Sequence, residues 1–281
     1  MITAHTRVAG VAGAPVRHSL SPLLHNAWLK EAGIDGVYIA FSPPQDGFPA
    51  FAEGMRGGAV VGLNVTIPFK QQALAAADDA SDLARAAGAA NLLLFHENGR
   101  IEARNTDGDG MMQALAAQAP HYDPKSGPAL VLGAGGAARG AVAALLAAGA
   151  PQVIICNRTL DRAEQLAATF GSRVRAFDRP DWAAPDAAVV INATSLGLGG
   201  GPGPHMPWKS MADTAVAMDM VYKPLRTEFL AGAEERGLTV VDGLEMLIRQ
   251  AIPAFEAFYG QAPPPQLDER RLLLDVLEAG G

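Results

Sequence analysis

The sequence predicts an α/β protein of two domains, with helices packed on mainly parallel sheets. Short β-branched runs alternate with alanine-rich periodic stretches, which is the strand–helix order of βαβ units. A glycine-rich turn at residues 133–138 lies between such a run and a helical pattern, as in nucleotide-binding folds. The 281 residues, 49% of them hydrophobic, suffice for two cores of ordinary size.

The N-terminal part predicts three strands, at residues 8–16, 36–41 and 62–67. Between the first two, the stretch "SPLLHNAWLKEAG" predicts a helix. Ser21 is the expected N-cap, because a hydroxyl there can accept a hydrogen bond from a free backbone N–H. Pro22 suits the first helical position, and Gly33 can close the helix.

The second part begins near residue 128 with a strand, the glycine turn, a helix and another strand. Further strands are expected within residues 186–194, 215–222 and 238–243. A helix after residue 243 carries Leu244, Leu247, Ile248, Ala251 and Phe255 on one side. Pro253 is expected to kink this helix or end it early. A last helix starts at an acidic cap near Asp268 and ends in glycines, after a proline connector at 263–265.

Composition excludes several classes of protein. A single cysteine, Cys156, excludes an internal disulfide framework and CxxC sites. The net charge of −7 does not favour binding to nucleic acid or to anionic lipid. The longest apolar run, residues 140–150, is too short to span a bilayer. The six histidines lack metal-site spacing, and the N-terminus lacks a signal-peptide pattern. We expect a cytoplasmic protein with a small-molecule substrate, no bound metal, and neither nucleic acid nor membrane as partner.

The segment Gly133-Ala134-Gly135-Gly136-Ala137-Ala138 fits the dinucleotide-binding pattern G-x-G-x-x-A. It follows a predicted strand and opens a predicted helix, the context in which a Rossmann domain binds pyrophosphate. Glycines allow the tight turn and the close approach of the backbone, and the helix N-terminus favours the anion. The alternative is a glycine-rich turn that only connects packed elements.

The residues after the second strand of this unit indicate which dinucleotide binds. An NAD site usually places a carboxylate there, whereas this chain has Arg158, with Arg162 four residues later. If a helix starts after Thr159, the two guanidinium groups can converge on one phosphate. The sequence therefore predicts NADP; the alternative is two solvated surface arginines.

The stretch "NVTIPFK" at residues 64–70 begins as a strand and ends on Lys70. Val65 and Ile67 are β-branched, and Pro68 stops any central strand pairing. Taken alone, Lys70 is most simply an exposed lysine.

Blocks of sequence in a fixed order resemble the shikimate dehydrogenase family over nearly the full length of the chain. They are "HSLSPLLHNAW" (18–28), "NVTIPFK" (64–70), "GAANLL" (88–93), "NTDGDG" (105–110), "GAGGAARG" (133–140), "NRTLDRA" (157–163), "INATSLG" (191–197), "DMVYKPLRTEFL" (219–230) and "DGLEMLIRQA" (242–251). The resemblance implies a substrate domain at 1–110, completed by helices at 245–281, and a Rossmann NADP-binding domain at 111–244. It also implies reversible NADPH-dependent reduction of 3-dehydroshikimate to shikimate, in aromatic amino-acid (chorismate) biosynthesis.

By this resemblance, Lys70 and Asp107 form the acid/base pair that exchanges a proton while hydride is transferred, and which of them carries the proton is left open. The implied substrate contacts are Ser19, Ser21, Thr66, Lys70, Asn91, Thr106, Asp107, Tyr222 and Gln250. The implied cofactor contacts are Asp82, Gly133, Ala134, Gly135, Gly136, Ala137, Asn157, Arg158, Thr159, Arg162, Thr194, Met220 and Gly243. Ser19 and Ser21 lie two residues apart, so an extended segment would present both on one side.

Five of these contacts have a simpler structural alternative. Ser21 can merely cap its helix, Thr66 can be satisfied by the strand ladder, and Asn91 can be a turn amide. Gln250 can be a polar residue of an amphipathic helix, and Met220 can be core. Ala90 and Leu92 depart from the commonest family pattern beside Asn91.

Two other functions stay open. A related oxidoreductase could prefer quinate or an aminated analogue, or use NAD, although Arg158 and Arg162 argue against NAD. The chain could instead be a regulatory protein that binds a dinucleotide but catalyses no reaction, although the presence of both Lys70 and Asp107 argues against this. A monomer and a homodimer are both compatible with the sequence.

Overall fold

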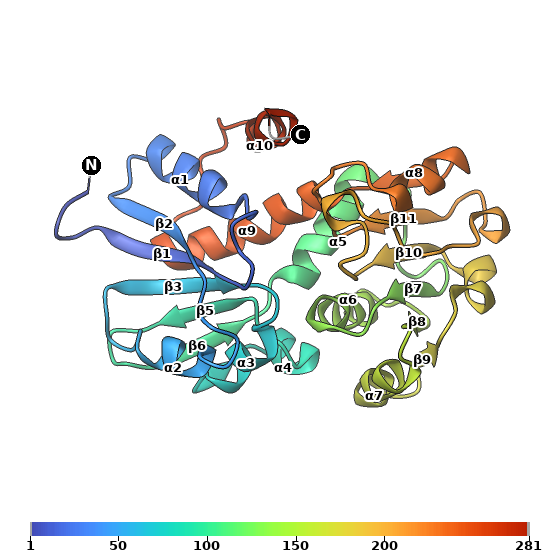
Figure 1. Ribbon diagram of the computed structural model, residues 1–281, viewed down its shortest axis with the longest axis horizontal. Coiled ribbons are helices and arrows are strands. Elements are labelled where there is room, and N and C mark those ends of the chain that lie inside the picture. The colour runs from blue at the N-terminus through green and yellow to red at the C-terminus, as the bar shows by residue number, and fades with distance from the viewer. Residues whose placement is uncertain (1, 280–281) are drawn as a thin grey trace. The chain divides into compact units, whose positions relative to one another are not determined.

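The computed structural model describes residues 2–279 and divides into two compact units (Figure 1). The described residues up to Thr106, together with those from Gln250 onward, form unit 1. Asp107–Arg249 form unit 2. The assignment of one domain to substrate and the other to cofactor stays a prediction.

Unit 1 is built on a six-stranded sheet with the strand order β2-β1-β3-β5-β6-β4. The strands are β1 (Arg7–Ala12), β2 (Gly36–Phe41), β3 (Val60–Val65), β4 (Asp79–Ala80), β5 (Leu92–Phe95) and β6 (Ile101–Arg104). β1 pairs in parallel with β2 and β3, and β4 with β6, while β5 is antiparallel to both of its neighbours. The predicted mainly parallel α/β architecture is confirmed.

Strand β3 ends two residues earlier than predicted. After Val65 the chain turns, because the Thr66 carbonyl accepts a hydrogen bond from the Phe69 N–H (2.9 Å). Thr66 and Ile67 therefore lie in a turn, and the next helix begins at Lys70. The β-branched character of Ile67 does not extend the strand, because its side chain is 62% exposed and has no packing to gain.

The helices of unit 1 are α1 (Ser21–Glu31), α2 (Phe48–Glu53), α3 (Lys70–Ala75), α4 (Asp82–Ala87) and α10 (Glu269–Ala279), with the second half of α9 (Gly243–Tyr259). The N-cap prediction for Ser21 is wrong: Leu20 occupies that position in a helical conformation, without a side-chain cap. Gly33 closes α1 as predicted, with φ of 65°. Asp268 caps α10 as predicted, since its Oδ1 accepts from the Arg271 N–H (2.9 Å). The predicted terminal glycines lie outside the described residues.

Helix α9 passes through Pro253 and continues to Tyr259, so the expectation of an early end is wrong. One face of the helix is fully buried at Leu244, Ala251 and Phe255. Burial of the Leu244 and Phe255 side chains contributes roughly 1.5–3 kcal/mol each, which offsets the roughly 3 kcal/mol that an interior proline costs.

Unit 2 holds a second six-stranded sheet, with the order β12-β11-β10-β7-β8-β9 and every pair parallel. Its strands are β7 (Ala129–Leu132), β8 (Val153–Cys156), β9 (Val174–Phe177), β10 (Val189–Asn192), β11 (Val216–Asp219) and β12 (Thr239–Val241). This is the doubly wound order of a Rossmann domain, which places loops for a ligand at the carboxyl ends of the central strands.

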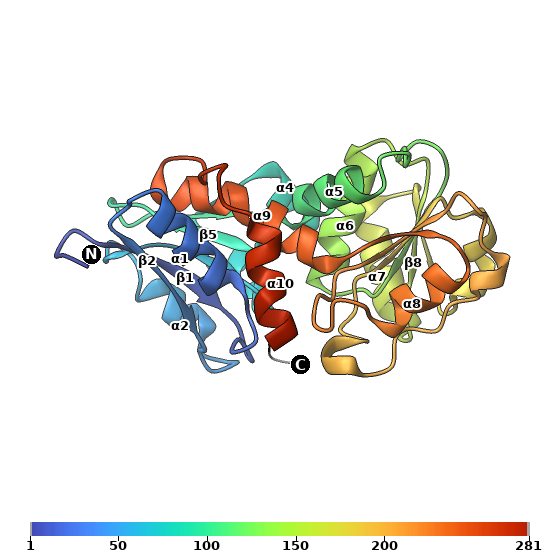
Figure 2. The same ribbon diagram turned by 90° about the horizontal axis from the view of Figure 1, so that it is seen from above.

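Helices cover both faces of the unit 2 sheet, which is why its strands read as continuous apolar runs (Figure 2). Val131, Ile155 and Ile191 pack in one core with α5 (Asp107–Gln118), α6 (Gly136–Ala147) and α7 (Leu160–Phe170). Alternate residues such as Leu130 and Val190 pack in a second core with α8 (Glu228–Glu235). Short 3₁₀ turns lie at Pro180–Trp182, Ala184–Asp186, Leu198–Gly200 and Trp208–Ser210.

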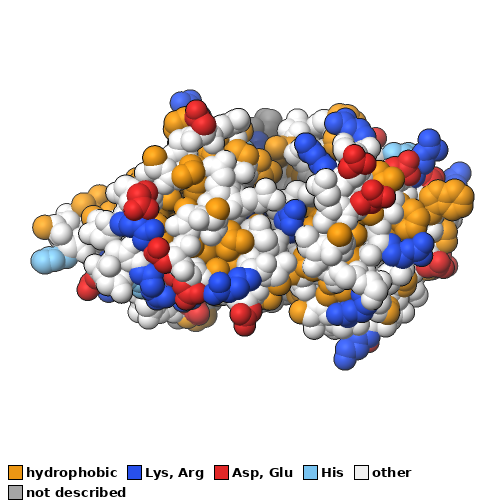
Figure 3. Space-filling view, turned by 90° about the horizontal axis from the view of Figure 1, so that it is seen from below, with side chains coloured by type: hydrophobic (Ala, Val, Ile, Leu, Met, Phe, Trp, Pro, Cys, Tyr) orange, Lys and Arg blue, Asp and Glu red, His pale blue; other side chains and the backbone are white. Residues whose placement is uncertain are grey.

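The surface carries charges of both signs, intermixed on the face that Figure 3 presents. Ion pairs join Arg56 to Asp78 (2.5 Å) and Arg104 to Glu102 (2.6 Å). Within residues 2–279, no helix combines the length and apolar character needed to cross a bilayer. The same residues contain no group of three or more His, Cys, Asp or Glu side chains arranged to hold a metal ion.

Candidate functional site

A buried network of side-chain amides and hydroxyls lies in unit 1 and joins three predicted substrate residues. The Asn91 Nδ2 donates to Thr106 Oγ1 (2.9 Å) and to Gln250 Oε1 (3.4 Å). The Asn91 Oδ1 accepts from the Thr106 N–H (2.8 Å), and the Thr106 hydroxyl donates to the Gln250 carbonyl (3.1 Å). Asn91 precedes β5, Thr106 follows β6 and Gln250 lies on α9, so the fold brings together residues that are distant in sequence.

Two residues that the sequence did not single out extend this network. The Tyr38 hydroxyl donates to Asn64 Oδ1 (2.7 Å), and Asn64 Nδ2 donates to the Asn91 carbonyl (3.4 Å). Tyr38 lies on β2 and Asn64 on β3, and both are buried. Burial raises the pKa of Tyr38 well above its usual value, and Tyr259 adds to the rise, while a hydrogen bond with the Ser21 side chain acts in the opposite direction.

Ser19 and Ser21 lie close together, although the segment between them is not extended as predicted. Leu20 has helical backbone angles, so the chain already turns into α1 at this point. The Ser21 N–H donates to Ser19 Oγ (3.3 Å). The pair is therefore held by a local hydrogen bond rather than by strand geometry.

Lys70 and Thr66 lie just beyond the carboxyl end of β3. The Thr66 N–H donates to the Ala12 carbonyl (2.9 Å), and the Lys70 carbonyl accepts from the Ala90 N–H (2.8 Å). The Lys70 side chain is half-buried at the first position of α3. Asp107 is buried at the first position of α5, in unit 2, and Asp82 is exposed at the start of α4, in unit 1.

The glycine turn in unit 2 connects β7 to α6, as the sequence predicted. Gly133 has φ of 108°, and a side chain there would lie 3.1 Å from Thr194 Cγ2, so only glycine fits without strain. Gly135 occupies the N-cap position of α6, where an added Cβ would meet nothing within 4 Å. The backbone of Gly135, with Ala134, Gly136 and Ala137 beside it, thus borders open space at a helix N-terminus, the environment that a pyrophosphate needs.

The helix predicted after Thr159 begins at Leu160, with Thr159 at the N-cap. The Asn157 Nδ2 donates to the Thr159 carbonyl (2.8 Å) and so shapes the turn that carries Arg158. Arg158 and Arg162 are both exposed, and neither guanidinium forms an ion pair among residues 2–279. The two side chains are therefore available to an anionic ligand.

A second buried polar network braces the carboxyl ends of β10 and β11. The Asp219 carboxylate accepts from Asn192 Nδ2 (2.9 Å), the Val221 N–H (2.9 Å) and the Thr227 hydroxyl (2.6 Å). Asn192 Oδ1 in turn accepts from the Thr194 hydroxyl (2.7 Å). Burial raises the pKa of Asp219 to about 6, against these three hydrogen bonds, which lower it.

Gly243 and Met220 meet in unit 2 through their backbones. A Cβ on Gly243 would lie 2.6 Å from the Met220 carbonyl oxygen, so any side chain would push apart the start of α9 and the segment after β11. Asp242 caps α9 beside them, since its Oδ1 accepts from the Leu244 and Glu245 N–H groups (3.1 and 3.0 Å). Tyr222 is half-buried two residues after Met220.

Several polar residues with structural roles escaped the sequence reasoning. Asn64, Asn192 and Asp219 lie inside the matching blocks and could have been found there, as could His25. Tyr38 lies outside the matching blocks, so the sequence does not point to it. The Arg139 Nε, on the first turn of α6, is buried without a hydrogen-bond partner among the described residues.

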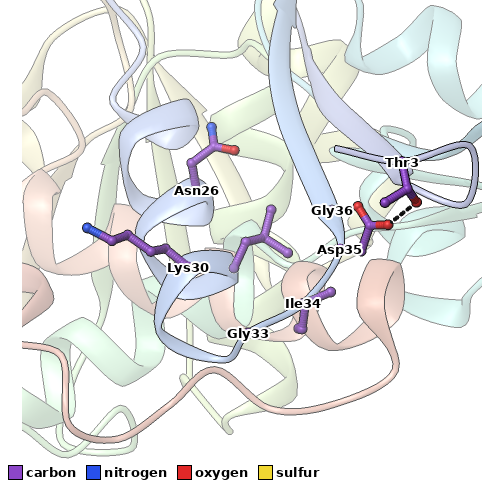
Figure 4. Close-up of a pocket in the computed structure, with 8 residues that line it drawn as sticks. Thr3, Asn26, Lys30, Gly33, Ile34, Asp35 and Gly36 are labelled. Carbon is purple, nitrogen blue, oxygen red and sulfur yellow. Dashed lines mark hydrogen bonds between the residues drawn. The ribbon is translucent and has the colours of Figure 1, made fainter. Parts of the chain in front are cut away.

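A cavity of about 490 Å³ lies elsewhere in unit 1, where the end of α1 faces the start of β2 (Figure 4). Thr3, Asn26, Lys30 and Asp35 line it, with Leu29, Gly33, Ile34 and Gly36, and none of these is a predicted site residue. Hydrogen bonds from Thr3 and Thr6 lower the pKa of Asp35.

Comparison with known proteins places the chain in one family. Residues 11–93 match the model of the shikimate dehydrogenase substrate binding domain, and residues 114–197 match that of shikimate / quinate 5-dehydrogenase. The shikimate dehydrogenase (NADP(+)) of Caulobacter vibrioides is 59% identical over 278 residues, 98% of each chain.

Solved structures agree with the sequence relatives. The shikimate dehydrogenase of Aquifex aeolicus is 36% identical with a TM-score of 0.88, covering 97% of this chain and 99% of that one. The shikimate 5-dehydrogenase of Thermus thermophilus, solved in complex with NADP(H) and shikimate, is 39% identical with a TM-score of 0.85, covering 95% and 98%. The chain belongs to the shikimate dehydrogenase family.

Proposed function

We propose that this chain catalyses the reversible, NADPH-dependent reduction of 3-dehydroshikimate to shikimate, a step of aromatic amino-acid (chorismate) biosynthesis. The observation that carries this proposal is 59% identity to an NADP-dependent shikimate dehydrogenase over 98% of both chains. The two predicted catalytic groups, the Lys70 ammonium and the Asp107 carboxylate, are both present.

The residues of unit 2 fit NADP. Gly133 allows the tight turn and Gly135 leaves room for the pyrophosphate, and the N–H groups that open α6 face an anion favourably. Arg158 and Arg162, with Asn157 and Thr159 shaping the turn, bind the 2′-phosphate, since guanidinium groups suit bidentate contact with phosphate. Thr194, Met220 and Gly243 border the nicotinamide end, and Asp82 is a further cofactor contact. When bound, NADPH supplies the hydride that reduces the carbonyl carbon.

The chain's own residues handle the substrate and the proton. Lys70 and Asp107 exchange the proton with the substrate oxygen, a role that contributes roughly 10²–10⁴-fold to the rate. Ser19 and Ser21 bind the carboxylate. Thr66, Asn91, Thr106, Tyr222 and Gln250 contact the remaining oxygens, and sites built on hydrogen bonds to hydroxyls discriminate strongly against analogues that lack them.

The test is an assay at the nicotinamide absorbance band, with shikimate or quinate and with NADP or NAD. Quinate is included because the matched family model covers shikimate and quinate enzymes. We expect shikimate with NADP to have the highest kcat/KM, by at least about tenfold over each other pair, because the relative at 59% identity is a shikimate dehydrogenase (NADP(+)) and the two arginines favour NADP. Comparable efficiency with quinate and NAD would overturn the assignment. Binding of NADP without turnover of either substrate would instead identify a regulator.

The remaining features fit a cytoplasmic enzyme acting on a small molecule. Burial raises the pKa of Cys156 to about 11, so the thiol stays protonated at neutral pH. A net charge of −7 disfavours nucleic acid as a partner. A homodimer is an alternative to a monomer, and sedimentation of the purified protein distinguishes them.

A further inference from the structure

We propose that Tyr38 is a positioning residue whose hydroxyl orients the buried amides of the substrate site. This inference rests on the proposed function, because it concerns the same substrate. The hydrogen bonds of Tyr38 run to Asn26 and Asn64, so we expect its effect on recognition of the substrate rather than on transfer of the hydride.

Tyr38 is fixed through its backbone and its ring. Asn26 Oδ1 accepts from the Tyr38 N–H (3.0 Å), and Asn26 Nδ2 donates to the Tyr38 carbonyl (2.8 Å). The phenol ring stacks on the imidazole of His25, with centroids 4.0 Å apart and planes inclined by 12°. A ring held in this way can direct its hydroxyl to one place only, and the side chain is 1% exposed.

The hydroxyl determines which way the Asn64 amide faces. A phenol has one proton to donate, and here it goes to Asn64 Oδ1 (2.7 Å). Asn64 Nδ2 must then point the other way, to the Asn91 carbonyl (3.4 Å). The same carbonyl accepts from the Val65 N–H (2.7 Å), so Asn64 and β3 together hold the peptide from which the Asn91 side chain projects.

The network continues from there to Thr106 and Gln250. Asn91 contacts both with its side-chain amide, so its position defines theirs. The Tyr38 hydroxyl therefore fixes the first of the linked amides, that of Asn64.

The test compares Tyr38→Phe with a matched control, Tyr259→Phe. The Tyr259 hydroxyl is also in unit 1 and donates to a carbonyl of the same strand, that of Val37 (3.2 Å), but it is not part of the amide network. For Tyr38→Phe we expect the KM for shikimate to rise roughly 5- to 50-fold, because a buried acceptor loses its donor. The KM for NADP and kcat stay within about twofold, and Tyr259→Phe changes none of the three by more than about twofold.

Asn64→Ser supplies the second measurement, alone and combined with Tyr38→Phe. If the hydroxyl acts through Asn64, the double variant has a KM for shikimate within about twofold of that of Asn64→Ser alone. Additive effects would overturn the proposal, and so would a KM for Tyr38→Phe equal to that of the wild type or of the control. Loss of kcat alone would also overturn it. Failure of the wild type to oxidise shikimate at all would instead refute the proposed function.

Discussion

The imidazole of His25 lies face to face with the phenol of Tyr38 in the core of unit 1, with ring centroids 4.0 Å apart. Trp28 packs against the same imidazole edge-on, at 5.3 Å. Both ring nitrogens of His25 are buried without a hydrogen-bond partner among the described residues. Burial lowers the pKa of His25 to about 3, so the side chain behaves as a neutral aromatic group at neutral pH.

This burial predicts acid sensitivity through His25. Between pH 6.5 and pH 3 the unfolded chain binds a proton at this residue and the folded chain does not, so the free energy of unfolding falls as pH falls. At pH 5 the loss is about 2 kcal/mol relative to pH 7. Urea unfolding at both pH values measures it, and His25→Phe removes this part of the pH dependence. His121→Gln, an exposed histidine, is the control; the same pH dependence in His25→Phe and wild type would contradict the prediction.

Asp219 predicts a pH dependence of opposite sign in unit 2. Its folded pKa is raised from 3.8 to about 6, so the folded state favours the protonated form and ionisation becomes progressively destabilising from pH 3.8 to 6. This carboxyl alone makes the protein about 1 kcal/mol more stable at pH 5 than at pH 7. Asp219→Asn keeps the shape and the acceptor for Asn192 but cannot titrate. On acidification, the free energy of unfolding of the wild type should therefore rise relative to that of Asp219→Asn. A constant difference between the two proteins would show that Asp219 does not titrate in this range.

Lys70→Ala tests the proposed acid/base pair. Loss of the ammonium should lower kcat by roughly 10²–10³-fold, because the proton transfer loses its positioned group. NADPH affinity should change by less than about twofold, as measured by fluorescence titration, since no cofactor contact is assigned to Lys70. Lys30→Ala removes an exposed lysine of α1 and is the control. If Lys70→Ala retains near-normal turnover, the proton is transferred by another group.

Arg158→Gln combined with Arg162→Gln tests the cofactor preference. Charge-assisted contacts to phosphate contribute about 1.5–3 kcal/mol each, so the ratio of kcat/KM for NADP to that for NAD should fall by at least about 100-fold. The kcat/KM for NAD should stay within a few fold of the wild type. Arg175→Gln is the control, because Arg175 lies over the Phe177 ring (5.2 Å) on β9. An unchanged ratio in the double variant would mean that both arginines are ordinary surface residues.

Much of the fold could be predicted because the relevant signals are local. The strand at residues 36–41 and the strand–turn–helix around Gly133 follow from β-branched runs and from glycines that permit positive φ. The ends of elements were less predictable. β3 stops at Val65 because Ile67 finds nothing to pack against, and α9 continues past Pro253 because packing of its apolar face outweighs the missing N–H.

The buried parts of the site could not be predicted from spacing. Asn64 reads as the first polar residue of a motif, and its partner Tyr38 reads as an ordinary strand residue. They meet only because β1 lies between β2 and β3 in the sheet, and this strand order is a property of the tertiary structure. The position of Ser21 suggested a helix cap, whereas Leu20 occupies the N-cap position of α1.

The Asn26 side-chain amide, which hydrogen-bonds both backbone groups of Tyr38, also affects whether copies of this chain can pair with one another. β2 is the outermost strand on its side of the sheet, and outermost strands invite another polypeptide to pair with them. Ile39, beside Tyr38, is 40% exposed and would add to that attraction. With both backbone groups of Tyr38 already engaged, an incoming strand would first have to displace the Asn26 side chain, and with it the α1 contact, so this amide protects the sheet against edge-to-edge aggregation.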